Sequence, residues 1–308
     1  MSRKSRKRNP TLKKLRRDLA YIAIRFWIAV FRLLPRTVGL AFASAVGKII
    51  PLFARTSYTT AVENLTAALG GERSHDEIRR IARDMFRHAA MNFADVARLG
   101  IMTADEIQAI TVPHNIDILR RHLQNGRGII ALTTHTGCWE HLGVYLATIG
   151  IPLSVVARKL YDPRLEKLLL ETRTQGGMIN ISRGGNTRDI IRALRNNTLL
   201  GVLVDQDFPA KGVFVNFFGR PAHTASSPAT LALKYDAPII PVFTYRDKEN
   251  RHHACIGDRI GVKLSGDGDA DITAIIAACS KVTEDFIRRH PEQWVWFHRR
   301  WKTQPPVK

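Results

Sequence analysis

The hydrophobic pattern changes along the chain, from helical repeats in the first third to short apolar runs afterwards. Apolar positions recur at alternating steps of three and four and form one stripe: Leu12, Leu15, Leu19, Ile22, Phe26, Ala29 and Leu33. This pattern predicts an amphipathic helix within residues 1–34, which ends at Pro35 because proline interrupts a helix. Further helical patterns cover residues 38–53, 60–69 and 76–99. We therefore expect residues 35–110 to be helical.

From about Thr111 onwards, strand-like and helix-like patterns alternate. Short runs rich in β-branched or other apolar residues predict strands at 128–134, 152–157, 178–181, 199–204, 239–245 and 254–260. Helical patterns lie at 116–125, 165–175, 187–196, 228–235 and 272–290. This alternation is typical of βαβ units. We therefore expect residues 111–308 to form an α/β core, with a mostly parallel central sheet flanked by helices, in one domain with residues 35–110.

Polar side chains follow several of these predicted strands. His135 follows the run 128–134, Arg158 and Arg183 follow two others, and Asp205-Gln206-Asp207 follows the run 199–204. Ligands of open parallel sheets usually bind at the carboxyl ends of the strands. These residues are therefore expected to share one cleft, in which Arg158 and Arg183 bind phosphate of the acceptor or the donor. Arg183 also opens a glycine-bearing turn before a helix, which either binds phosphate or is a plain turn.

His135 and Glu140 have the spacing H-x-x-x-x-E. On one regular helix they would point about 140° apart, so they meet only if the chain turns between them. Gly137 permits such a turn. A carboxylate beside an imidazole orients the ring and raises its basicity, which makes a general base for a hydroxyl. We therefore predict that His135 is a base oriented by Glu140; the alternative is a histidine at a strand end and an unrelated surface glutamate.

Metal binding is a second interpretation of the same stretch. His135, Cys138, Glu140 and His141 are metal-ligand residue types, but they match neither zinc motif H-E-x-x-H nor H-x-x-E-H. Asp205 and Asp207 could hold Mg²⁺, although two acids after a strand are more often hydrogen-bonding groups of a loop. We predict no metal and no cofactor.

Charge adds information about partners. The chain has 47 Lys plus Arg against 27 Asp plus Glu, a formal net charge of +20, which implies nucleic acid, an anionic membrane or an acidic protein as partner. Basic residues crowd the N-terminus: Arg3, Lys4, Arg6, Lys7, Arg8, Lys13, Lys14, Arg16 and Arg17. With the apolar stripe, they favour a helix lying on an anionic membrane surface over a helix packed on the domain. Arg25 and Arg32 make the run 19–34 a poor membrane span.

The other composition signals are weaker. Three cysteines without framework spacing favour a reducing cytoplasm. Near the C-terminus, Trp294, Trp296 and Trp301 alternate with basic residues, a pattern that suits an interface between apolar and anionic surfaces. No recognised nucleic-acid-binding module surrounds them, so we predict no nucleic acid.

Four separated blocks together resemble one family, the bacterial lipid A late acyltransferases. His135-Thr-Gly-Cys-Trp-Glu140 resembles their H-x4-E/D motif, with Cys138 where the family usually has Asn. The segments VDQD at 204–207 and FVNFFG at 214–219 resemble a further block, and PEQW at 291–294 with HRRWK at 298–302 resembles their C-terminal block. The helical N-terminus is the fourth.

The resemblance implies a glycerolipid-acyltransferase-like α/β fold on the cytoplasmic face of the inner membrane. It further implies transfer of a fatty acyl chain from acyl-carrier protein to a hydroxyl of a phosphorylated lipid A precursor, with no metal and no covalent intermediate. His135 and Glu140 would be catalytic. The expected substrate-binding residues are Arg158, Arg183, Asp205, Gln206, Asp207, Arg299 and Arg300. The alternatives are acylation of another glycolipid, such as a phosphatidylinositol mannoside, from acyl-CoA, and a non-enzymatic basic membrane- or nucleic-acid-binding protein.

Overall fold

The computed structural model describes residues 10–182 and 187–306. The chain begins with four helices, α1 (Pro10–Leu33), α2 (Arg36–Phe53), α3 (Arg55–Leu69) and α4 (His75–Leu99). Pro35 separates α1 from α2, as the sequence predicted. Ser74 and Glu77 form a reciprocal capping box that fixes the start of α4.

The rest of the chain alternates strands and helices. In chain order these are α5 (Ala104–Ala109), β1 (Thr111–His114), α6 (Ile116–Leu123), β2 (Ile129–Thr133), α7 (Trp139–Thr148), β3 (Leu153–Ala157), α8 (Pro163–Gln175), β4 (Ile179–Ser182), α9 (Thr187–Arg195), β5 (Leu199–Leu203), β6 (Gly212–Phe217), β7 (Arg220–Ala225), α10 (Ser227–Tyr235), β8 (Ile239–Arg246), β9 (His252–Ile256) and α11 (Gly268–Arg289). A short 3₁₀ turn, η1 (Pro291–Gln293), follows α11.

Seven strands form the central sheet in the order β1-β9-β8-β2-β5-β3-β4. All neighbours are parallel except β8 and β9, which form an antiparallel pair. The predicted mostly parallel α/β sheet is therefore confirmed. The sequence patterns missed α5, β1 and the separate β6–β7 hairpin, and they extended β9 beyond its end at Ile256. Arg220, Pro221 and His223 obscure the strand pattern of β7, whereas the run Val213-Phe214-Val215 of β6 was a usable signal.

Strand β2 lies in the middle of the sheet and is covered on both faces. Ile129 and Ala131 pack into a core with α5, α6 and α7, whereas Ile130 and Leu132 pack into a second core with α9, α10 and α11. This is the alternation expected of a strand buried on both sides. It places the residues that follow β2 at the centre of the sheet's carboxyl edge.

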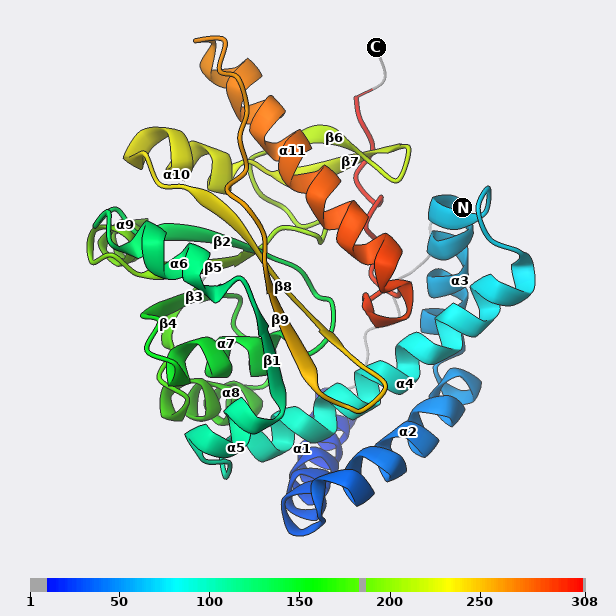
Figure 1. Ribbon diagram of the computed structural model, residues 1–308. Coiled ribbons are helices and arrows are strands. Elements are labelled where there is room, and N and C mark those ends of the chain that lie inside the picture. The colour runs from blue at the N-terminus through cyan, green and yellow to red at the C-terminus, as the bar shows by residue number, and fades with distance from the viewer. Residues whose placement is uncertain (1–9, 183–186, 307–308) are drawn as a thin grey trace.

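Helix α4 joins the N-terminal helices to the sheet (Figure 1). Gly47 of α2 lies so close to α4 that an added Cβ would be 2.5 Å from the Cα of Arg87. The buried carboxylate of Asp95 in α4 binds Arg36 at 2.9 Å, Arg246 at 2.7 Å and His252 at 2.9 Å. These contacts link α2 and α4 to β8 and β9.

The outer surface of α1 and α2 is apolar. The predicted stripe of α1 does not pack on the domain: Leu15, Leu19, Ile22, Phe26 and Leu33 are all exposed. Exposed residues of α2 extend this surface: Val38, Phe42, Ile49, Leu52 and Phe53. Among the described residues, α2 is also the one helix whose length and composition are sufficient for a membrane span.

The C-terminal tryptophans are not at a surface. Trp294, Trp296 and Trp301 are buried in a core with α3, α4 and the β6–β7 hairpin. The interpretation of this segment as an aromatic interface is therefore wrong. Aromatic residues alternating with arginines mark a segment here that inserts its rings into the protein.

Candidate active site

His135 lies directly beyond the carboxyl end of β2 and contacts the carboxylate that follows β5. Its Nδ1 is 2.8 Å from Oδ1 of Asp205, and the His135 side chain is 20% exposed while that of Asp205 is 0% exposed. β2 and β5 are neighbours, with Thr133 opposite Leu203, so the two residues after these strands meet. Because Nδ1–H donates to Asp205, Nε2 is left to accept a proton.

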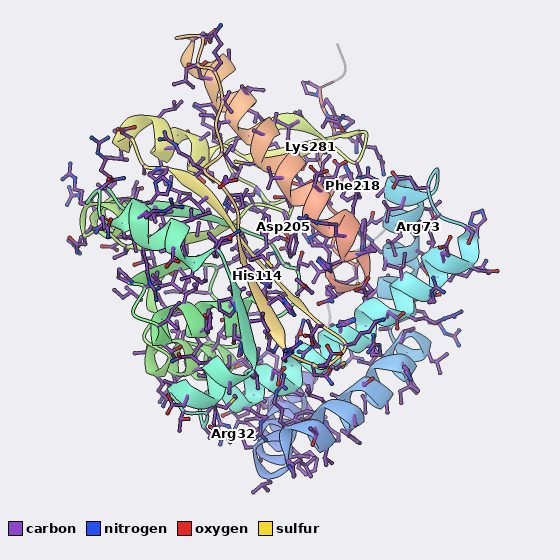
Figure 2. All side chains as sticks on the ribbon, in the orientation of Figure 1. Arg32, Arg73, His114, Asp205, Phe218 and Lys281 are labelled. Carbon is purple, nitrogen blue, oxygen red and sulfur yellow. The ribbon has the colours of Figure 1, made fainter. Side chains whose placement is uncertain are left out.

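Asp205 is held from several directions. Its Oδ2 accepts hydrogen bonds from the Thr134 hydroxyl at 2.9 Å, the His135 backbone N–H at 2.7 Å and the Trp294 indole N–H at 2.7 Å. Burial would raise the pKa of this carboxyl, but His135 and the surrounding donors outweigh burial and hold the pKa well below its usual range. The carboxylate is thus charged, buried in the interior (Figure 2) and fixed in orientation.

The turn after His135 depends on Gly137. This residue has φ = +58°, and an added Cβ would be 2.5 Å from the Thr244 carbonyl oxygen. Asn92 of α4 donates to the Gly137 carbonyl at 2.7 Å, and the Gly137 N–H donates to the Gln293 carbonyl at 3.1 Å. The glycine needed for a turn between His135 and Glu140 is therefore present and tightly enclosed.

Glu140 has a different partner from the one predicted. It receives two hydrogen bonds from Arg173 of α8, at 2.8 and 2.5 Å, and this pair is largely buried. Burial opposes the charge on Arg173, but the bond to Glu140 outweighs burial and raises the pKa of Arg173. The expectation that Glu140 orients His135 is corrected by these contacts, since the orienting carboxylate is Asp205.

Apolar space lies on two sides of Trp139 and Glu140. The first space, here called the sheet pocket, runs between the sheet and α7 past Gly143, Leu146, Leu153, Met178 and Leu199, with a volume of about 60 Å³. The second, the α4 pocket, has a volume of about 280 Å³ and is lined by Asn92, Phe93, Val96, Trp294 and Phe297 among others. The Trp139 ring meets the His135 ring edge to face, with centroids 4.9 Å apart. The two apolar spaces therefore share Trp139, whose ring contacts the imidazole.

Sequence comparisons agree with this geometry. Residues 5–303 match the family described as bacterial lipid A biosynthesis acyltransferase. The chain belongs to this family. It is 24% identical over 292 residues to the lipid A biosynthesis palmitoleoyltransferase of Escherichia coli (strain K12), covering 91% of this chain and 93% of the relative. It is 27% identical over 229 residues to a phosphatidylinositol mannoside acyltransferase of Mycolicibacterium smegmatis, covering 72% of this chain and 69% of the relative. The enzyme is thus an O-acyltransferase with a lipid acceptor.

The other residues that were predicted to bind substrate in this acyltransferase lie at several separate places. Arg158 is exposed just after β3, and Gln206 is half-buried beside Asp205. Arg183 lies outside the described residues. Arg299 is exposed and lines a separate cleft with Arg220 and Lys302.

Two predicted substrate-binding residues hold the C-terminal segment instead. Asp207 accepts from the Thr303 backbone N–H at 2.6 Å, and its own N–H donates to Nε2 of His298 at 2.9 Å. Arg300 is buried and donates to the His223 carbonyl and the Thr224 hydroxyl, while burial lowers its pKa to about 10. Both side chains are therefore engaged within the protein, and their binding of substrate stays a prediction.

The four side chains considered as metal ligands point to separate partners. His141 contacts the Thr111 hydroxyl at 2.8 Å and stacks on His252, and burial lowers its pKa well below the usual value. Burial raises the pKa of the Cys138 thiol to about 12. Within residues 10–182 and 187–306, no group of three or more His, Cys, Asp or Glu side chains is placed to hold a metal ion.

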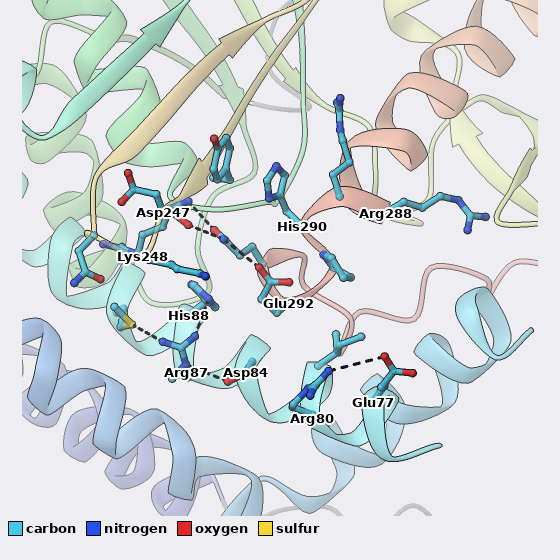
Figure 3. A pocket seen from close by; sticks show the side chains of 18 of the residues that line it. Glu77, Arg80, Asp84, Arg87, His88, Asp247, Lys248, Arg288, His290 and Glu292 are labelled. Atoms are coloured by element: carbon cyan, nitrogen blue, oxygen red, sulfur yellow. Dashed lines mark hydrogen bonds and ion pairs between the residues drawn. The ribbon is translucent and has the colours of Figure 1, made fainter. Parts of the chain in front are cut away.

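A cleft of about 870 Å³ lies elsewhere, between α4, the β8–β9 turn and the end of α11 (Figure 3). Its walls are charged, and several of the charges pair with each other, as Arg87 does with Asp84 at 3.1 Å and Arg80 with Glu77 at 3.9 Å. Neither His135 nor Asp205 lines it. This charged cleft is therefore separate from the His135–Asp205 pair.

Sequence reasoning missed Arg173, Thr134 and the role of Trp294. Arg173 carried no usable signal, because it lies within a helix without a motif. The pairing of His135 with Asp205 had a usable signal: both residues follow predicted strands, and placing these strands side by side would have brought the two together.

Proposed function

We propose that this acyltransferase transfers a fatty acyl chain from acyl-carrier protein to a hydroxyl of a phosphorylated lipid A precursor, with His135 as general base. The observation that carries the proposal is the hydrogen bond from His135 Nδ1 to the buried carboxylate of Asp205, 2.8 Å long. This bond orients the ring and leaves Nε2 to remove a proton, and the Trp139 ring that contacts the imidazole lines both apolar pockets. A positioned base of this kind accelerates a reaction about 10²–10⁴-fold.

The chemistry follows from this arrangement. His135 Nε2 takes the proton of the acceptor hydroxyl as its oxygen attacks the thioester carbonyl carbon. The tetrahedral intermediate collapses by breaking the carbon–sulfur bond, and the imidazolium returns the proton to the departing thiolate. Asp205 stabilises the imidazolium throughout, because its carboxylate is already charged and fixed. No nucleophilic side chain of the protein is required.

The proposed partners suit the charge of the chain. The formal net charge of +20 favours an acidic carrier protein and a phosphorylated lipid. We propose that the basic residues 1–17 and the exposed stripe of α1 anchor the enzyme to the cytoplasmic face of the inner membrane, and that residues 35–308 form the acyltransferase domain. The exposed apolar face of α1 and α2 supports this arrangement.

Acylation of a phosphatidylinositol mannoside from acyl-CoA is the second candidate. It is favoured by the 27% identity to the mycobacterial relative. Both candidates use the same base and differ in donor and acceptor.

The test supplies purified enzyme with labelled acyl-carrier protein or acyl-CoA, and with lipid A precursors or phosphatidylinositol mannosides, and identifies the products by mass. We expect an added acyl chain on the lipid A precursor from acyl-carrier protein. Product only from acyl-CoA and the mannoside would replace the first candidate by the second. Failure of both acceptors with the folded enzyme would contradict the proposed function.

A further inference from the structure

A groove connects the membrane-facing helix α1 to the α4 pocket. This groove, here called the α1–α8 groove, has a volume of about 530 Å³ and lies between α1, α4 and α8. Phe93 and Val96 of α4 line both the groove and the α4 pocket. Trp139 and Glu140 in turn line both the α4 pocket and the sheet pocket. The three spaces therefore share walls from α1 to the surroundings of His135.

We propose that an acyl chain of the lipid acceptor lies in the α1–α8 groove and reaches the site through the α4 pocket, past Phe93. This inference rests on the proposed function, because it assigns the acceptor of that reaction to a place on the protein. It goes beyond that function by naming a chain-binding site for the acceptor, separate from the sheet pocket.

The lining of the groove matches a lipid with a phosphorylated headgroup. Besides the residues of α4, its apolar walls include Ile24 and Ile28 on α1 and Leu165, Leu168 and Leu169 on α8. Arg25 and Arg32 of α1 also line it and supply positive charge. The acidic residue in the lining, Glu171, already has Lys167 within 3.8 Å. The apolar walls thus suit the methylene chain of the lipid, and the guanidinium groups suit the oxygens of its phosphate.

The location of the groove favours the acceptor over the donor. α1 borders the groove and also presents the exposed stripe that includes Leu19, Ile22 and Phe26. A chain in a bilayer against that stripe can enter the groove sideways without crossing water, which avoids the cost of exposing its methylene groups. The donor carries one acyl chain. The sheet pocket can bind that chain, with the end of the chain among Leu146, Leu153 and Leu199.

Phe93 and Val96 mark the junction that the chain must pass. The Phe93 side chain is exposed, with 37% of its surface accessible, and its ring meets Phe31 of α1 edge to face at 6.0 Å. Val96 is half-buried. A tryptophan at position 96 would fill the junction, whereas Leu168→Trp would fill the groove from α8.

Photolabelling tests the location without requiring turnover. The probe is a phosphorylated diacyl lipid with a diazirine in mid-chain, mixed into anionic vesicles with the full-length protein, and labelled residues are found by mass spectrometry. We expect labels on α4 at 93–96 and on α8 at 165–169, reduced in Val96→Trp and in Leu168→Trp. Leu233→Trp, on the exposed surface of α10, is the matched control and should retain them. Labels confined to the outer face of α2, or a diazirine-bearing acyl thioether donor analogue that labels the groove instead, would overturn the proposal.

Kinetics test the role of the site. Long-chain and short-chain forms of the same phosphorylated acceptor are compared in wild type, Val96→Trp and Leu168→Trp, after thermal unfolding confirms that each variant is folded. We expect the KM for the long-chain acceptor to rise at least about tenfold. A tenfold rise is the loss of binding free energy expected when roughly two methylene groups of the chain are no longer buried. The KM values for the short-chain acceptor and the donor should stay unchanged. Folded variants that keep the full preference for long chains would refute the assignment. If the wild type transfers no acyl group, the proposed function fails, while the labelling result still decides where the lipid chain binds.

Discussion

Substitution of Asp205 by Asn tests the catalytic pair most directly. The change preserves the size of the side chain but removes the charge that faces the imidazolium in the transition state. The His135–Asp205 hydrogen bond is 2.8 Å long, and two unit charges about 4 Å apart interact by about 4 kcal/mol at an effective dielectric constant of about 20. Since about 1.4 kcal/mol corresponds to a tenfold change in rate, we expect kcat to fall about 10³-fold.

The assay measures single-turnover acyl transfer at saturating donor and acceptor, so that binding does not mask the chemical step. Far-ultraviolet circular dichroism and thermal unfolding must first show that Asp205→Asn is folded, because its Oδ2 also receives hydrogen bonds from Thr134 and Trp294. His135→Ala gives the reference for complete loss of the base. A folded Asp205→Asn enzyme within tenfold of wild type would refute the reasoning.

Glu140 and Arg173 provide the matched comparison. Because these two side chains bind each other, Glu140→Gln and Arg173→Gln should have similar effects, and the double variant should be no worse than either one. Loss of kcat in Glu140→Gln equal to that in His135→Ala, with Arg173→Gln unaffected, would show that Glu140 acts on His135 during turnover.

Four further outcomes are expected. Removal of residues 2–17 should release much of the protein from anionic vesicles in a flotation assay, and high salt should weaken the remaining binding; unchanged binding would contradict the anchor. Arg158→Ala should raise the acceptor KM by the equivalent of about 1.5–3 kcal/mol with an unchanged melting temperature. Gly143→Leu should shorten the acyl chain accepted, measured by product mass, because an added Cβ at Gly143 is already 2.6 Å from Sδ of Met178 in the sheet pocket. Burial lowers the pKa of His252 to about 4, so between pH 6.5 and 5 the unfolded chain gains this proton and the folded protein does not. His252 should therefore contribute about 2 kcal/mol to the fall in the free energy of unfolding over that interval in chemical denaturation, and the fall should be smaller by that amount in His252→Gln.

The sequence predicted the elements better than their neighbours in space. Apolar runs located β2 and β5 and placed His135 and Asp205 at strand ends, because burial on both faces leaves a local signature. Strand order leaves none, so the contact between these two residues was not predicted, and Glu140 was chosen as the nearest carboxylate in sequence. The same reason explains the tryptophans at 294, 296 and 301. Their alternation with charged residues is compatible with a surface or a core, and only the position of α3, α4 and the hairpin decides for the core.

The indole N–H of Trp294, bound to Asp205, has a consequence for the order of events during synthesis. The helices that carry the apolar face, α1 and α2, emerge from the ribosome long before Trp294 does. The nascent protein can therefore settle at a bilayer before its imidazole has a correctly held carboxylate. Under the proposed mechanism, a chain interrupted before this residue would lack the indole that holds Asp205, and it would occupy the lipid surface without reacting with its substrates.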